Sequence, residues 1–151
     1  MGYAEKVLQP DEQILYRSRI HWLIYAPGVL WLVLAAVIFA CQSVIQASDW
    51  LNYVAAVAGL IGVLRLLGAA ILRSSTEIAV TDRRLIYKVG LIRRNTIEMN
   101  RHQIESIEVR QSILGRLFNY GTVIVHGTGS GIEPIRRVGS PLALRSAVTA
   151  Q

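Results

Sequence analysis

Two long apolar runs, separated by only seven residues, constrain this chain more than any other feature. The first, Trp22–Gln42, has no charged residue, and the second, Trp50–Leu72, has only Arg65. As helices they would each extend about 30 Å at ~1.5 Å per residue, which matches the hydrocarbon thickness of a bilayer. The sequence predicts a transmembrane hairpin with helices over 22–42 and 50–73. An apolar hairpin buried within a soluble protein is the alternative.

Basic residues flank these runs on one side only. Arg17 and Arg19 precede the first run and Arg73 closes the second, whereas the connection Ser43–Asp49 has no basic residue. Cytoplasmic segments next to membrane helices are enriched in Lys and Arg. We therefore expect a multi-pass protein with both termini cytoplasmic. Its parts are an N-terminal segment over 1–21, an extracytoplasmic loop over 43–49 and a cytoplasmic domain over 74–151.

Small residues recur at helical spacing within both runs. They are Ala36 and Ala40 in the first run, and Ala55, Ala58, Gly59 and Gly62 in the second. Small-xxx-small patterns allow helix backbones to approach closely. We expect these residues at helix contacts, either within the hairpin or with a neighbouring copy of the chain.

Arg65 is the single charge inside the two runs. A charge within the bilayer is costly and often functional, which favours a role in transport or gating. Arg65 also lies eight residues before Arg73, roughly 12 Å along a helix. Its side chain could therefore reach the cytoplasmic headgroups or pair across a subunit interface. Both interpretations remain open.

After Arg73, continuous apolarity gives way to short alternating segments separated by turn residues, a pattern typical of strands. We expect strands over 77–81, 85–89, 91–99, 104–110, 122–126 and 132–138, with a further strand from residues 12–20. Ser112 predicts the N-cap of a short helix through Asn119, and Ser140-Pro141 predicts the start of a final helix through Val148.

Several short motifs in this region occur together in a known family. They are Thr81-Asp82-Arg83-Arg84-Leu85, Gly90, Gln111-Ser112 followed by Leu114-Gly115, and Tyr120-Gly121-Thr122. With them, the stretch from Glu77 to Ser130 resembles the bacterial pleckstrin-homology-like (bacterial PH) domain of small two-helix membrane proteins, and Glu12–Trp22 also fits. The resemblance implies a membrane α + β fold: a transmembrane hairpin plus a small, strongly bent antiparallel PH-like sheet with a C-terminal helix. It gives no indication of an enzyme.

The residues that usually carry catalysis or bind metals form no recognisable pattern. His21, His102 and His126 are far apart and lack HExxH spacing, and the lone Cys41 excludes a multi-cysteine metal site. The GTGSG stretch over 127–131 lacks the Lys-Ser/Thr of a phosphate-binding loop and predicts a hairpin turn instead. We expect no enzyme, no metal and no cofactor.

A distributed basic surface remains, and the chain has a formal net charge of +6. The residues of this surface are Arg83, Arg84, Lys88, Arg93, Arg94, Arg101, Arg136 and Arg137. Its predicted anion- or lipid-binding residues are Arg83, Arg84, Lys88, Arg93 and Arg94. A domain tethered beside an anionic leaflet gains about 1 kcal/mol per basic residue near the surface. The alternative is a solvated basic face without a specific ligand. Nucleic acid is disfavoured as a partner because few aromatic residues are interleaved with the basic ones.

The leading functional hypothesis is a non-catalytic scaffold or binding module in the bacterial cytoplasmic (inner) membrane. Its expected partners are the lipid bilayer and further copies of the chain, since an isolated two-helix hairpin buries little surface and a sheet leaves edge strands to cover. Another membrane protein stays open as a partner. The alternatives are anionic headgroup binding by the basic face and a transport or channel subunit that uses Arg65.

Overall fold

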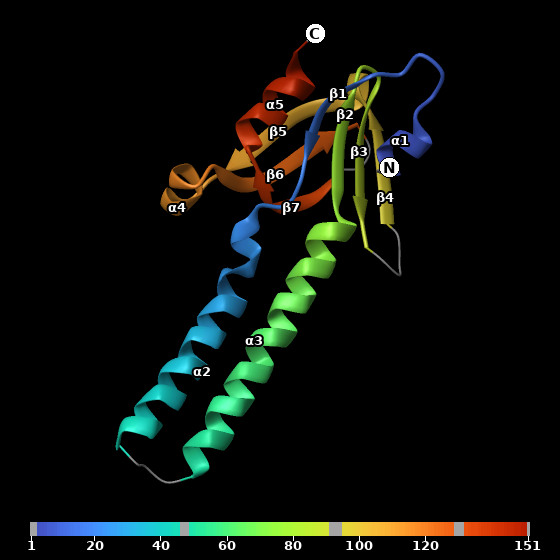
Figure 1. Cartoon of the computed structure of the whole chain (residues 1–151). Helices are drawn as coiled ribbons and strands as arrows, with labels where there is room; N and C mark the ends of the chain where they lie inside the picture. Colours follow the sequence, from blue (N-terminus) through green and yellow to red (C-terminus); the bar gives the residue numbers. More distant parts are fainter. Residues whose placement is uncertain (1–2, 46–48, 91–94, 129–131, 151) are drawn as a thin grey trace. The chain divides into compact units, whose positions relative to one another are not determined.

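A computed structural model describes residues 3–45, 49–90, 95–128 and 132–150. The chain forms two compact units (Figure 1): Trp22–Ile71 is one, and Met1–His21 together with Leu72–Gln151 is the other. We call them the hairpin unit and the β unit. The β unit is built from segments on both sides of the hairpin, so the hairpin is an insertion within it.

The hairpin unit consists of two long helices that run side by side in opposite directions (Figure 1). A 3-10 turn, η1 (Trp22–Tyr25), leads into α2 (Ala26–Ile45), and α3 (Trp50–Ser75) returns. The two predicted helices are confirmed, and each continues a few residues further than predicted. Both are long and apolar enough to cross a membrane, judged by length and composition.

Glycines on each helix of the hairpin accommodate leucines from the other. A Cβ atom added at Gly28 would lie 2.7 Å from Leu66 Cδ2, and one at Gly62 would lie 2.8 Å from Leu32 Cδ2. Neither position has room for a methyl group, so the two backbones approach closely, as small residues at helix contacts permit.

The small residues of α3 that were predicted at a helix contact lie along this seam: Ala55, Ala58, Gly59 and Gly62. Ala36 and Ala40 are exposed on α2, and their contact with a neighbouring copy stays a prediction. Ala35 lies opposite Gly59, where an added Cβ would be 3.8 Å from the Ala35 Cβ. The seam on α2 thus follows positions 28, 32 and 35, a spacing that leaves Ala36 and Ala40 on another face.

Four antiparallel strands make the first sheet of the β unit, in the order β1-β2-β3-β4. Their bounds are β1 (Ile14–Ser18), β2 (Glu77–Thr81), β3 (Arg84–Val89) and β4 (Asn95–Asn100). The pairing of β1 with β2 confirms the strand predicted from the N-terminal segment. A short helix, α1 (Tyr3–Val7), precedes β1, and the Tyr3 backbone N–H donates to the Glu77 carboxylate at 2.7 Å.

Three antiparallel strands make a second sheet, in the order β5-β6-β7. They are β5 (Ile104–Arg110), β6 (Tyr120–Gly127) and β7 (Ile132–Gly139), with a short helix α4 (Ile113–Leu117) between β5 and β6. A 3-10 turn, η2 (Arg101–Gln103), separates β4 from β5. The single bent sheet expected from the sequence is therefore divided in two, because this turn interrupts the ladder.

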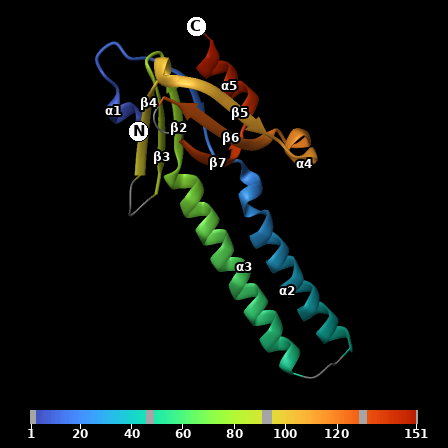
Figure 2. The same ribbon diagram turned by 180° about the vertical axis from the view of Figure 1, so that it is seen from behind.

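The core of the β unit lies between the two sheets and is closed by the final helix, α5 (Pro141–Thr149). Alternate strand residues such as Ile78, Val80, Val123 and Val125 point into it, and α5 adds Leu144 and Val148. Seen from behind (Figure 2), α5 packs against strands of both sheets. A backbone bridge between Ile20 and Val138 joins the segment after β1 to β7.

Candidate functional site: the basic surfaces of the β unit

The turn between β2 and β3 is built around one buried hydroxyl. Thr81 Oγ1 donates to Glu12 Oε1 at 2.7 Å and accepts from the backbone N–H of Arg84 at 2.9 Å. The Gln13 N–H donates to the Asp82 carboxylate at 3.1 Å, which ties the N-terminal segment to the same turn. The tight turn predicted from Thr81 to Arg84 is present, and hydrogen bonds between its own residues stabilise it.

Arg84 occupies the centre of this network. Its Nε and Nη2 atoms donate to the two carboxylate oxygens of Glu12 at 2.9 and 2.8 Å, and its Nη1 donates to Glu98 at 2.7 Å. A further bond from Nη2 reaches the carbonyl of Val7 at 2.8 Å. These partners leave the guanidinium little capacity for an external anion.

Glu12 is the buried partner in this pair, with only 6% of its surface exposed. The hydrogen bonds from Arg84 are the largest cause that lowers the pKa of Glu12 to about 2, against the opposing effect of burial. A carboxylate held in this way is charged at any physiological pH. The Glu12–Arg84 pair therefore fastens the segment before the hairpin to the sheet that follows it.

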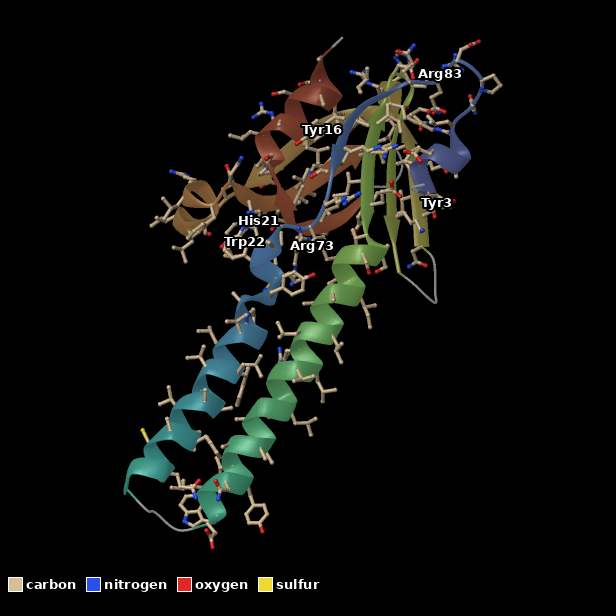
Figure 3. All side chains as sticks on the ribbon, in the orientation of Figure 1. Tyr3, Tyr16, His21, Trp22, Arg73 and Arg83 are labelled. Carbon is tan, nitrogen blue, oxygen red and sulfur yellow. The ribbon has the colours of Figure 1, made fainter. Side chains whose placement is uncertain are left out.

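The other predicted anion-binding residues do not gather into one described surface. Arg83 is exposed, and Figure 3 shows it at the end of the β unit away from His21 and Arg73. The Lys88 Nζ lies 4.5 Å from the centre of the Tyr3 ring, a cation–π contact. Arg93 and Arg94 lie outside the described residues. Anion binding by this set stays a prediction.

A second basic surface lies beside α4, a helix that hydrogen bonds hold at its start. Ser112 caps the helix by accepting the Gly115 N–H at 3.1 Å, as predicted, and Gln111 Nε2 donates to the Tyr120 carbonyl at 3.1 Å. A Cβ on Gly115 would lie 2.7 Å from the Tyr120 carbonyl oxygen, and one on Gly121 would lie 2.8 Å from Gln111. These close approaches explain why glycine occurs twice in this motif.

A groove of about 650 Å³ lies beside α4. Four arginines contribute to its lining: Arg110, Arg116, Arg137 and Arg145. Arg110 is paired with Glu108 at 2.6 Å. The other three guanidinium groups bind no described residue, and no carboxylate belongs to the lining described. We call Arg116, Arg137 and Arg145 the arginine groove.

Sequence reasoning included only Arg137 of the arginine groove in the predicted basic surface, because the members of the groove come from α4, β7 and α5, which are well separated along the chain. Arg137 also has an unusual backbone, with φ of 58°, at an irregularity in the pairing of β6 with β7. Non-glycine residues seldom adopt this left-handed conformation. Only the paired basic residues Arg136-Arg137 in a predicted strand gave a signal in the sequence.

His21 connects the arginine groove to the last residues before the first apolar helix. Its ring stacks on Tyr120 with centroids 5.4 Å apart, and its backbone N–H donates to the Arg137 carbonyl at 2.7 Å. Burial, followed by the nearby charge of Arg73, lowers the pKa of His21. This shift favours the neutral imidazole, and the groove is anchored to the chain one residue before Trp22.

No grouping of three or more His, Cys, Asp or Glu side chains that could hold a metal occurs in the described ranges. The Nε2 atom of His126 lies 3.9 Å from the Glu108 carboxylate. In the hairpin unit, Arg65 lies on an exposed part of α3. The groups that the fold brings together are thus basic and apolar, which suits binding of anions or lipids.

Comparison with known proteins agrees with this architecture. Neither the search of curated proteins nor that of solved structures found a match. A family model described as Bacterial PH domain matches residues 22–151, which include both apolar helices and every strand after them. This match covers well over half of the chain and confirms the resemblance carried by the Thr81–Leu85 and Gln111–Thr122 motifs. The chain belongs to the bacterial PH domain family.

Proposed function

We propose that this chain is a non-catalytic, membrane-anchored binding module. α2 and α3 cross the bilayer, and the β unit stands on the cytoplasmic side with both termini. The observation that carries the proposal is the outer surface of the hairpin unit, where large apolar side chains such as Leu30 (68% exposed) and Phe39 (63%) project outward. Lipid would remove this surface from water at a gain of roughly 25 cal/mol per Å².

Labelling of single cysteines in bacterial cells tests this topology. Cys41 is first replaced by Ser, and a cysteine is then placed at Gln46 in the predicted extracytoplasmic loop or at the exposed Glu105 on β5. A membrane-impermeant maleimide should label Gln46→Cys in intact cells and Glu105→Cys only after permeabilisation. Equal labelling of both in intact cells, or release of the protein from membranes by alkaline carbonate, would refute the anchored topology.

The module assembles with further copies of itself, and the hairpin unit supports this part of the proposal. The exposed Ala36 lies beside a shallow apolar depression between α2 and α3, which Ala35, Ala55 and Phe39 also line. A helix from a second copy fits against small residues of this kind. The mass of the full chain in mild detergent and in nanodiscs is the direct test. A discrete oligomer is expected, and a monomer in both media would exclude self-assembly.

A further inference from the structure

The helix α4 displays its large apolar side chains although it is rigidly held. Ile113 is 87% exposed and Leu117 is 75% exposed, and Leu114 and Phe118 are also exposed. The polar contacts of Gln111 and Ser112 described above fix the helix in place, so the exposure belongs to the folded state. A rigid, exposed apolar cluster on a folded domain usually marks an interaction surface.

The arginine groove lies beside this cluster, because Arg116 is part of the same helix and lines the groove. The three guanidinium groups together carry three positive charges that no described carboxylate neutralises. Arginine suits phosphate because its planar group can donate two parallel hydrogen bonds. The groove has a volume of about 650 Å³, within the range usual for small-ligand sites.

Apolar side chains beside arginines without carboxylate partners suit one kind of ligand. A phospholipid carries a charged phosphate above apolar acyl chains, and surface-bound helices commonly present basic and apolar groups to these two layers. A second copy of this protein would also cover apolar residues, but its own net charge of +6 opposes contact with an arginine cluster. The charges therefore favour an anionic lipid.

Along the sequence, the groove is anchored next to the start of the first apolar span. His21 is bonded to Arg137 and stacked on Tyr120, and the next residue, Trp22, begins the apolar span. An anchor of the groove is thus the residue that immediately precedes the span. Arg83 and Arg84 lack such a link, since their turn is at the far end of β2 from Ser75.

We infer that the arginine groove binds the phosphate of an anionic phospholipid and that the apolar side chains of α4 enter the interfacial layer beside it. This inference rests on the proposed membrane anchoring and names a ligand class for the module. The site differs from the Arg83–Arg94 surface predicted from the sequence.

The first test measures which lipid the full-length protein retains. The chain is reconstituted in phosphatidylcholine bilayers that contain phosphatidylglycerol, and lipids that remain bound are counted by native mass spectrometry. The groove variant Arg116→Gln/Arg145→Gln is compared with Arg83→Gln/Arg136→Gln, which loses the same charge outside the groove. Retention of phosphatidylglycerol should weaken roughly thirty-fold in the groove variant, at about 1 kcal/mol per basic residue, and little in the control.

Equal weakening in both variants would mean general electrostatic attraction and would overturn the inference. Retention of phosphatidylcholine and phosphatidylglycerol alike by the wild-type chain would overturn it too. Alkaline carbonate extraction tests the anchoring separately. If the chain resists extraction but shows no headgroup preference, the lipid inference is wrong and the anchored topology still stands.

A second test locates α4. In the Cys41→Ser background, a fluorescent probe is attached at Leu117→Cys or, as a control, at Glu105→Cys on β5. Spin-labelled lipids should quench the probe at Leu117 and spare the probe at Glu105. If aqueous iodide and lipid quenchers both fail to reach Leu117, another protein surface covers α4 and the lipid inference is wrong. If iodide alone quenches it, α4 stays in water and the inference is also wrong.

Discussion

At the scale of single residues, the structure separates basic side chains that stabilise the fold from those available to a ligand. Arg84 is bonded to Glu12 and Glu98, and Arg101 donates to carbonyls at the end of α5, including that of Val148 at 2.9 Å. Arg116 and Arg145 have no such partner among the described residues. Sequence patterns could not make this distinction, since the carboxylate that binds Arg84 lies 72 residues away.

Removing the charge of Glu12 should destabilise the β unit strongly. Glu12→Gln leaves Arg84, whose side chain is only 13% exposed, without its main carboxylate. Breaking a pair with one fully buried partner costs about 3 kcal/mol. Glu108→Gln is the matched control, because its pair with Arg110 is exposed and should contribute little. Urea unfolding of the full chain in detergent, followed by circular dichroism, measures both. Similar losses in the two variants would contradict a special role for Glu12.

The same pair predicts how stability depends on pH. The pKa of Glu12 is about 2 in the folded chain and 4.5 as the reference value, so the folded state favours the ionised form. Its contribution, about 3 kcal/mol, is fully present above pH 4.5 and is lost as the pH falls towards 2. The free energy of unfolding should therefore drop on acidification more steeply in the wild type than in Glu12→Gln. Parallel pH profiles would contradict the assignment.

Arg137 provides a test of backbone conformation separate from charge. Because its φ is 58°, glycine at this position should relieve strain of roughly 1 kcal/mol and offset the entropy that glycine itself costs. Arg137→Gly should thus match or exceed the wild type in stability, whereas Arg136→Gly should lose about 1 kcal/mol. Thermal unfolding of both variants decides this. If the lipid inference holds, Arg137→Gly also retains less phosphatidylglycerol despite its intact fold.

At the scale of elements, local patterns predicted most of the fold. The strands at 77–81 and 104–110 have the predicted bounds, and the short helix after Ser112 and the helix after Ser140-Pro141 both form. Ser140 nevertheless has a left-handed backbone and makes no cap through its hydroxyl. The division into two sheets was missed because it depends on a three-residue turn, η2, whose sequence RHQ carries no turn signal.

The helix seam predicts different effects for two glycines on α3. At Gly62 an added methyl would meet Leu32, including its backbone nitrogen at 3.1 Å, whereas at Gly68 nothing lies within 4 Å. Gly62→Ala should force the helices apart and weaken the hairpin, while Gly68→Ala should be neutral or favourable through helix propensity. Denaturation in mixed detergent micelles, monitored by energy transfer between labels on α2 and α3, compares the two. Equal behaviour would contradict the close packing.

At the scale of the whole molecule, the hairpin is inserted between β1 and β2, so the segments before and after it pair within one sheet. Two further links join the segment before the hairpin to the segment after it. They are the Glu12–Arg84 ion pair and the hydrogen bond from the His21 N–H to the Arg137 carbonyl. Sequence alone placed the two units in order but could not identify these links, which join residues 72 and 116 positions apart.

Self-assembly through the apolar depression of the hairpin unit leads to the last prediction. Ala36 is exposed and borders the apolar depression of the hairpin unit, so Ala36→Leu should fill the place that a neighbouring helix would occupy. Ala70→Leu adds the same bulk at another exposed position, on α3. Mass measurements in nanodiscs should show a smaller assembly for Ala36→Leu and an unchanged one for Ala70→Leu. If the wild type is oligomeric and both variants keep its mass, the copies meet elsewhere, and the outer edge of β4 becomes the next surface to test, since unpaired strand edges readily associate.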